Sequence, residues 1–255
     1  MPSPNVKEDA RRVYEAIKGG GLAILQLTVG YTMMGSTAEA LDRMFLAKKR
    51  GPEKRHAMGG NLELHQQIHI MHLEHAEMVR CLIEDFDLPL GIVAPYRKDH
   101  PIIKNIDTRT LEVTTAGDTL FMLINAGKLL DEVTKLTMAV NIPILGSSSN
   151  LSGTGAKFRF EDVPEELKSV SDVTLDYGLI KFVHSPRTSS TMLDFSGPVP
   201  KVLRIGVGYE IIRDHIQRFW GTELPNDPGF HVNPSGHMGT APAPLKSLQD
   251  LITVS

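Results

Sequence analysis

The chain has 255 residues, of which 41% are hydrophobic and 22% are charged, an ordinary globular composition that excludes wholesale disorder. Its net charge at pH 7 is −3, which disfavours binding to nucleic acid through bulk charge. Cys81 is the single cysteine, so an intramolecular disulfide and a four-cysteine zinc site are excluded within one chain. Because no run of about 18 apolar residues is present and residues 1–9 lack a signal-peptide core, we expect a cytoplasmic protein without a membrane partner.

Apolar residues spaced by three or four, with glycine or proline at the ends, are typical of amphipathic helices. This pattern predicts helices over residues 9–18, 38–48, 61–85, 119–140 and 209–219. Ser36 and Glu39 have the S-x-x-E spacing of a capping box, which predicts where the second of these helices begins. The segment 28–35, which contains two glycines, is expected to be a loop.

Short apolar runs between these helices favour strands. They lie at residues 22–27, 88–94, 111–115, 142–145, 179–183, 191–195 and 202–205. Helices and strands alternate early and strands cluster late, which predicts an α/β or α+β sheet with helices packed on it. After Trp220 the chain is polar and rich in proline. We therefore predict one domain over residues 1–220 and a tail over 221–255 that contains proline and histidine and lies on the body or on a neighbouring subunit.

A run of six cations surrounds the end of the second predicted helix. Its members are Arg43, Lys48, Lys49, Arg50, Lys54 and Arg55. Such a cluster can hold phosphate or carboxylate groups, and arginine offers a planar fork for them. The alternative is that these cations complement the helix dipole and lie in water.

A serine-rich loop follows the strand predicted at 142–145. Ser148 and Asn150 supply a hydroxyl and an amide, and the small neighbouring residues allow a ligand to approach the backbone. Successive backbone N–H groups in such a loop can bind an anion. The alternative is a polar turn, since serine, asparagine and glycine are common turn residues.

Four histidines are spaced by three or four residues along the predicted helix 61–85, and so lie on one border of its apolar face. They are His65, His69, His72 and His75. Gln66 stands where the H-E-x-x-H motif needs its glutamate, which excludes a zincin. A transition metal could still bind two of these histidines, with His231 or His237 as a further ligand. The alternative is a set of histidines hydrogen-bonded at a packing or subunit interface.

Four short motifs follow one another in an order that is similar to a known family. They are K-x-R at 48–50, S-x-N at 148–150, S-T-M-L-D at 190–194 and V-L-R-I-G at 202–206. Together with the helix, the three glycines and the strand at the start of the chain, they resemble the YrdC-like family over residues 9–206. The best-known members of that family are threonylcarbamoyl-AMP synthases.

The resemblance implies an α/β fold with a twisted, open, mixed sheet, flanking helices and a concave basic face. It implies binding of ATP with Mg²⁺, bicarbonate and threonine, and formation of a carbamoyl-adenylate with release of pyrophosphate. In that case Lys48 and Arg50 are the catalytic cations that contact phosphate or carboxylate charge. The residues that bind substrate and nucleotide are then Tyr31, Ser148, Asn150, Ser190 and Arg204. Fixed cations and hydroxyls of this kind stabilise a transition state that gathers negative charge.

Two segments depart from the family pattern, and one of them is residues 93–95, which read V-A-P where the family has R-x-P. Residues 26–29 read Q-L-T-V where the family has P-T-[DE]-T, which implies an altered small-molecule substrate. Two alternative functions stay open. One is a metal-dependent hydrolase or lyase of small carboxylates that uses His65, His69 and His72. The other is a non-enzymatic RNA-binding module, which the net charge disfavours. A homodimer is a further hypothesis, prompted by the tail.

Overall fold

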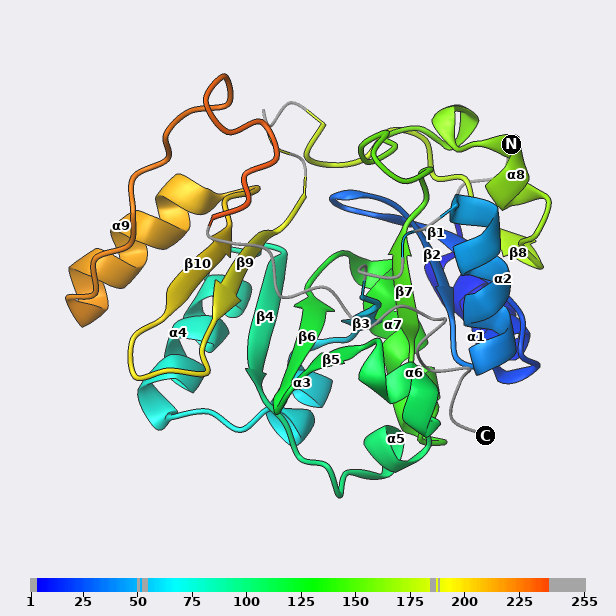
Figure 1. The fold of residues 1–255 in the computed structure, drawn as a ribbon, viewed down its shortest axis with the longest axis horizontal. Helices are drawn as coiled ribbons and strands as arrows, with labels where there is room; N and C mark the ends of the chain where they lie inside the picture. Colours follow the sequence, from blue (N-terminus) through cyan, green and yellow to red (C-terminus); the bar gives the residue numbers. More distant parts are fainter. Residues whose placement is uncertain (1–3, 50, 52–54, 184–186, 188, 239–255) are drawn as a thin grey trace.

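The computed structural model describes residues 4–49, 51, 55–183, 187 and 189–238 (Figure 1). Ten strands form one mixed sheet in the order β10-β9-β4-β6-β3-β7-β2-β1-β8, and β5 pairs with β6 outside this path. The strands are β1 (Ala23–Leu27), β2 (Gly30–Gly35), β3 (Ala57–Gly59), β4 (Leu90–Pro95), β5 (Thr115–Ala116), β6 (Thr119–Ile124), β7 (Leu145–Ser148), β8 (Val173–Thr174), β9 (Thr191–Asp194) and β10 (Lys201–Arg204).

Helices flank this sheet and connect its strands. They are α1 (Val6–Lys18), α2 (Ala38–Lys48), α3 (Leu62–Ile68), α4 (Leu73–Glu84), α5 (Pro101–Lys104), α6 (Thr108–Glu112), α7 (Lys128–Met138), α8 (Glu165–Lys168) and α9 (Tyr209–Trp220), with a 3₁₀ turn at Phe160–Asp162. The expected α/β class, with a mixed sheet, flanking helices and a single domain, is confirmed. No helix within the described residues is long and apolar enough to cross a membrane.

The sheet separates two hydrophobic cores. Successive side chains of a strand point to opposite faces, and in β1 Ile24 belongs to one core while Leu25 belongs to the other. The larger core includes apolar side chains of α2, α3, α4 and α9, whereas the smaller one is formed mainly under α1 and α7. In Figure 1, α1 and α2 lie at the β1–β2 end of the sheet, and α4 and α9 lie at the β9–β10 end.

The segment 28–35, expected to be a loop, contains β2, so that prediction is wrong. It pairs with β1 on one side and with β7 on the other. At Gly146 of β7 a Cβ atom would overlap the Met33 carbonyl oxygen, so glycine allows this close approach. The sequence pattern did not indicate β2, because two of its residues are glycines, which are more typical of loops than of strands.

The helix predicted over 61–85 is also wrong, because the chain breaks into α3 and α4. The break lies at residues 69–72, where the backbone turns extended. His69 forms a bridge with Tyr96, and the Ile70 N–H donates to the Pro95 carbonyl at 2.7 Å. Pairing with the end of β4 therefore outweighs the helical pattern of the sequence.

Four further boundaries differ from the predictions, and the first is the strand predicted at 142–145, which is β7 over Leu145–Ser148. The segment 119–140 is strand β6 followed by α7, rather than one helix. The segment 111–115 contains the end of α6, a turn and the first residue of β5, and 179–183 is turn and irregular structure. The helices at 9–18, 38–48 and 209–219 are confirmed, as are the strands at 22–27, 88–94, 191–195 and 202–205.

After α9 the chain runs back to the sheet (Figure 1). The Ile205 N–H donates to the Gly236 carbonyl at 2.8 Å, and the Met238 N–H donates to the Leu203 carbonyl at 2.9 Å. Gly236 has φ 72°, and a Cβ there would overlap the Ile205 carbonyl oxygen. Residues 236–238 therefore cover the outer edge of β10.

Candidate functional site

Lys48 ends α2 and turns its side chain inward. It is 2% exposed, and its ammonium donates to the carbonyl of Asn150 at 2.7 Å and to the carbonyl of Ser148. A buried ammonium is costly unless acceptors surround it, and these two carbonyls supply part of that shell. The structure thus brings together three residues that the sequence predicts as functional.

The loop after β7 is held from several directions. The Ser149 N–H donates to the Tyr31 carbonyl at 2.7 Å, and the Asn150 amide donates to the Leu151 carbonyl at 2.6 Å. The Ser148 hydroxyl donates to the Asn150 side-chain oxygen and lies at an exposed residue. This loop therefore presents a hydroxyl to solvent above a buried positive charge.

Two other cations of the run, Arg43 and Arg55, make their contacts away from this loop. Arg50 and Lys54 lie outside the described residues. Arg43 pairs with Asp172 at 3.1 Å, and Arg55 donates to the carbonyls of Glu112 and Thr115. Burial lowers the pKa of Arg55 below its ordinary value. Arg43 and Arg55 thus tie α2 and the segment after it to neighbouring parts of the fold.

Tyr31 lies beside the loop through its backbone, while its side chain points elsewhere. The side chain is fully buried, and its hydroxyl donates to the Gly178 carbonyl at 2.7 Å and lies 3.1 Å from the Asp176 carboxylate. Burial and the Asp176 charge raise the pKa of this hydroxyl above its ordinary value. Gln26, in a segment that departs from the family pattern, donates to the same Gly178 carbonyl at 2.8 Å.

Ser190 and Arg204 form a second group at the β9–β10 end of the sheet. The Arg204 guanidinium donates to the Ser190 carbonyl at 3.0 Å and to its hydroxyl at 3.1 Å. Burial lowers the pKa of Arg204 to about 10, so the guanidinium stays charged at pH 7. Strands β9 and β7 are four steps apart in the sheet, roughly 19 Å at the usual strand spacing. The predicted residues therefore form two groups.

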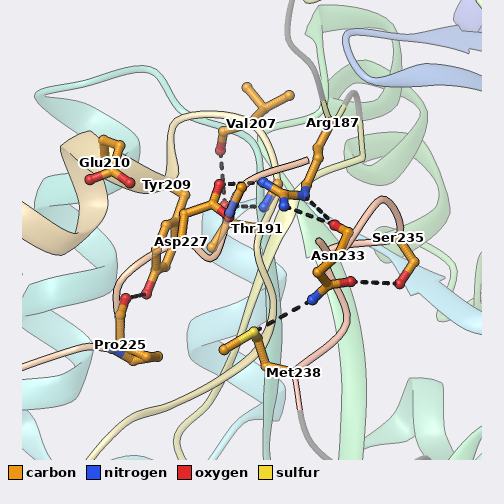
Figure 2. Close-up of polar contacts among 12 residues, drawn as sticks. Arg187, Thr191, Val207, Tyr209, Glu210, Pro225, Asp227, Asn233, Ser235 and Met238 are labelled. Carbon is orange, nitrogen blue, oxygen red and sulfur yellow. Dashed lines mark hydrogen bonds and ion pairs between the residues drawn. The ribbon is translucent and has the colours of Figure 1, made fainter. Parts of the chain in front are cut away.

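Arg187 is a buried cation that the sequence analysis missed. It is 8% exposed and donates to the Asn233 carbonyl at 2.8 and 3.1 Å, and it pairs with Asp227 (Figure 2). Tyr209 adds a bond from its hydroxyl to the Pro225 carbonyl. No motif marks this arginine, because its partners lie about 40 residues further along the chain in the polar segment after α9.

The histidines are placed differently from the expected metal site. The His69 Nε2 lies 3.2 Å from the Leu120 carbonyl, and the Nδ1 atoms of His65 and His69 are 2.7 Å apart. These contacts assign a proton to His69 Nε2 and to His65 Nδ1. Burial lowers the pKa of His65 to about 4 and that of His69 to about 3, so both rings are neutral at pH 7.

His72 lies beyond the break, as the residue before α4, and is exposed. Among the residues that the structure describes, no three His, Cys, Asp or Glu side chains are grouped to hold a metal ion. The expectation that the histidines share one helix face is wrong, because the extended backbone at 69–72 separates them.

A cavity of about 310 Å³ lies between α3, α5 and the end of α7. Its lining includes Glu63, Gln67, His100 and Lys135. None of the residues that the sequence predicts as functional lines it. The His100 ring lies 3.4 Å from the Gln67 side-chain oxygen and accepts the Ile102 N–H at 3.3 Å.

The fold is similar to those of several solved proteins. A hypothetical protein from Streptococcus mutans UA159, smu.1377c, aligns with TM-score 0.68 and 21% identity, over 84% of this chain and 93% of that one. P. abyssi Sua5 complexed with L-threonine aligns with TM-score 0.68 and 20% identity, over 94% of this chain and 64% of that one. Full-length HypF in its phosphate- and nucleotide-bound form aligns with TM-score 0.54 and 19% identity, over 80% of this chain and 29% of that one.

This chain thus spans slightly less than two thirds of the Sua5 chain. No family model matches the sequence, and no curated protein matches it. At these identities the likeness concerns the arrangement of helices and strands, in agreement with the order of motifs in the sequence. The chain therefore has the YrdC-like fold.

Proposed function

We propose that this chain is a YrdC-like enzyme that binds ATP with Mg²⁺ and a small carboxylate and forms a carbamoyl-adenylate. The observation that carries the proposal is the loop after β7, where the buried Lys48 ammonium donates to the backbone carbonyls of Ser148 and Asn150 and Ser148 is an exposed residue. The fold supports it as well, since one solved protein of this fold holds L-threonine and another holds phosphate and nucleotide.

The loop suits a phosphate group for electrostatic reasons. Lys48 places a positive charge behind the loop in a buried setting, where a charge acts over a longer distance than it does in water. On binding, the Ser148 hydroxyl donates to a phosphate oxygen in place of the Asn150 side chain. Lys48 is then a positioning residue for this loop, and its charge adds to the attraction for the anion.

The donors at the loop also indicate how Mg²⁺ would enter. They are a hydroxyl, an amide and an ammonium, which fit phosphate oxygens rather than a bare cation. Mg²⁺ would therefore be held by the phosphate oxygens of the nucleotide, and it would neutralise part of their charge.

The proposed reaction needs no reactants besides ATP, bicarbonate and the amine of the acceptor. The amine of the acceptor and bicarbonate give a carbamate and water. A carbamate oxygen then attacks the α-phosphorus of ATP, the bond to the bridging oxygen of the β-phosphate breaks, and pyrophosphate leaves. Arg50, Ser190 and Arg204 complete the anion-binding set in this proposal. The guanidinium of Arg204, held by Ser190, would face the carboxylate.

The acceptor is proposed to differ from threonine. Gln26 and Tyr31 are both bonded to Gly178, so the segment 26–29 that departs from the family pattern is occupied by contacts within the chain. An acceptor of different shape, recognised by its carboxylate and amine, fits this change.

The test measures pyrophosphate release from ATP and Mg²⁺ with bicarbonate and a panel of amino acids. We expect release that depends on bicarbonate and on one class of amino acid. Ser148→Ala should lower kcat/KM by about tenfold or more, equal to about 1.4 kcal/mol in the barrier. Ser152→Ala, at an exposed residue of the same loop, is the matched control. Failure to bind ATP at millimolar concentration in calorimetry would contradict the proposal.

A further inference from the structure

The outward side of α9 carries an apolar stripe. Ile211 and Phe219 are 47% and 65% exposed, and His215 lies one helical turn from each. The ring of His215 packs against Phe219 and against Phe86, with centroids 4.6 Å apart in both pairs. Figure 1 shows α9 at the outer end of the molecule, beyond β10.

This aromatic stripe, made of Ile211, His215, Phe219 and Phe86, is more than scattered surface hydrophobics. His215 contacts both Phe86 and Phe219, Ile211 lies one turn before it on the same side of the helix, and Phe86 is itself 39% exposed. The His215 Nε2 atom is buried and has no hydrogen-bond partner among the described residues. Contiguous exposed apolar patches of this kind mark interaction surfaces.

Charges along one flank of the stripe indicate which partner fits. Arg218 and Asp214 pair with each other at 3.0 Å, and their side chains are 65% and 63% exposed. At about 100° per residue, both lie on the same side of the stripe. This flank carries a positive and a negative charge one helical turn apart. In an antiparallel copy their order is reversed, so the positive charge of one helix can face the negative charge of the other.

The geometry of such a pair can be worked out from the helix alone. A two-fold axis perpendicular to α9 at His215 brings the same flank of each helix together. Arg218 then lies about 4.5 Å along the helix from the axis, and Asp214 lies about 1.5 Å from it on the other side. In the antiparallel copy Asp214 therefore falls about 3 Å from Arg218 along the helix, within reach of an arginine.

We propose that two copies of this chain associate by packing α9 against α9 in antiparallel orientation around His215. The aromatic stripe forms the apolar centre, with Ile211 of each copy opposite Phe219 of the other. In the dimer, Arg218 of one copy pairs with Asp214 of the other copy instead of with Asp214 of its own helix. An isologous two-fold interface of this kind is the commonest arrangement of soluble oligomers.

The test is sedimentation equilibrium of the full chain from 1 to 100 µM, concentrations chosen to span about two decades of association. We expect a dimer for the unchanged protein. Phe219→Arg should weaken the dimer at least about tenfold, because it places a charge at the apolar centre. Leu46→Arg, at an 80% exposed residue of α2, should leave it unchanged. The melting temperature of each variant checks that the fold is intact, and Ile211→Glu provides a second substitution in the stripe.

A charge exchange tests the orientation. Asp214→Arg alone should weaken association, and the double variant Asp214→Arg with Arg218→Asp should restore it, because both cross-interface pairs reform. A monomer at every concentration would overturn the proposal. So would a dimer that Phe219→Arg and Ile211→Glu leave intact, and a double variant as weak as the single one would overturn the antiparallel arrangement.

Discussion

The loop after β7 and the segment after α9 are both fastened by a buried cation, and the two cations act differently. Lys48 reaches two carbonyls of one short loop, at Ser148 and Asn150. Arg187 reaches a carboxylate and a carbonyl that lie six residues apart, at Asp227 and Asn233. The first loop is also continuous with a strand that pairs on both sides, whereas the second segment follows the last helix.

The difference shows how the chemistry of the cation suits the task. An ammonium on a flexible stem can draw neighbouring carbonyls toward a point and so define the shape of a loop. A planar guanidinium offers donors in two directions and can join separate parts of a segment to the body. Lys48 therefore sets the local geometry of a candidate site, while Arg187 attaches a distant part of the chain.

The largest effect is expected for Lys48→Met. It removes the donor from two carbonyls in a buried setting, which should lower the free energy of unfolding by about 3 kcal/mol. Denaturant unfolding measures this change. Lys49→Met is the matched control, since Lys49 is exposed. Equal stabilities of the two variants would show that the Lys48 ammonium does not hold the loop.

Arg187→Met should have the next largest effect, about 2 kcal/mol, because it leaves the Asp227 carboxylate without its partner. We also expect faster hydrogen exchange in residues 225–238 while the exchange of β7 stays unchanged. Arg213→Met removes a more exposed arginine that contacts Asn226 at 2.7 Å, and it should cost under about 1 kcal/mol. Faster exchange in β7 would contradict the separation of the two regions.

A pH-dependent effect is expected for His65 and His69, whose buried rings are neutral at pH 7. The pKa values of His65 and His69 are lowered in the folded chain to about 4 and about 3. Stability from this pair is therefore complete above the unfolded pKa of about 6.5 and is lost as the pH falls toward 4. We expect a loss of about 2.5 kcal/mol between pH 7 and pH 5.5, which is the sum for the two histidines.

Denaturant unfolding across this pH range measures the loss. A double variant, His65→Gln with His69→Gln, should flatten the pH dependence, whereas His72→Gln at an exposed residue should leave it as it is. Other histidines with lowered pKa values, His75 and His100, keep some slope in the double variant. A double variant with the slope of the unchanged protein would contradict this assignment.

The smallest effect is expected at the start of α2. The Thr37 hydroxyl accepts the Ala40 N–H at 3.2 Å, while the Ser36 hydroxyl donates to the Ile17 carbonyl at 3.0 Å. Thr37→Ala should lower the free energy of unfolding by about 1 kcal/mol. Glu39→Ala should change it by less than about 0.5 kcal/mol, because the capping box predicted for Ser36 and Glu39 does not form. Thermal unfolding of the two variants compares them directly.

The elements predicted correctly and those missed differ in what determines them. Helix α1 has an apolar stripe bounded by glycines, so local pattern and structure agree. The run that becomes β6 is apolar at nearly every position, which hides its alternation between the two faces of the sheet. The break before α4 depends on pairing with Tyr96, a contact between segments that no local pattern records.

The candidate site was predictable to a similar degree. The order of motifs assigned Lys48, Ser148 and Asn150 to one site, and the Lys48 ammonium contacts the backbone carbonyls of the other two residues, about 100 residues away. It did not indicate that the Tyr31 side chain points toward Gly178, or that Arg187 is buried under a proline-rich segment. Burial depends on what covers a residue, and the covering segments carry few recognisable patterns.

The bonds between residues 203–205 and 236–238 have a consequence for synthesis of the chain. A chain whose synthesis stops near residue 220 and is released contains the strands of the sheet but lacks the segment that covers β10, so the backbone groups of that edge are exposed. Such an edge is a template for pairing with other chains. Residues 236–238 therefore protect the β10 edge against such pairing.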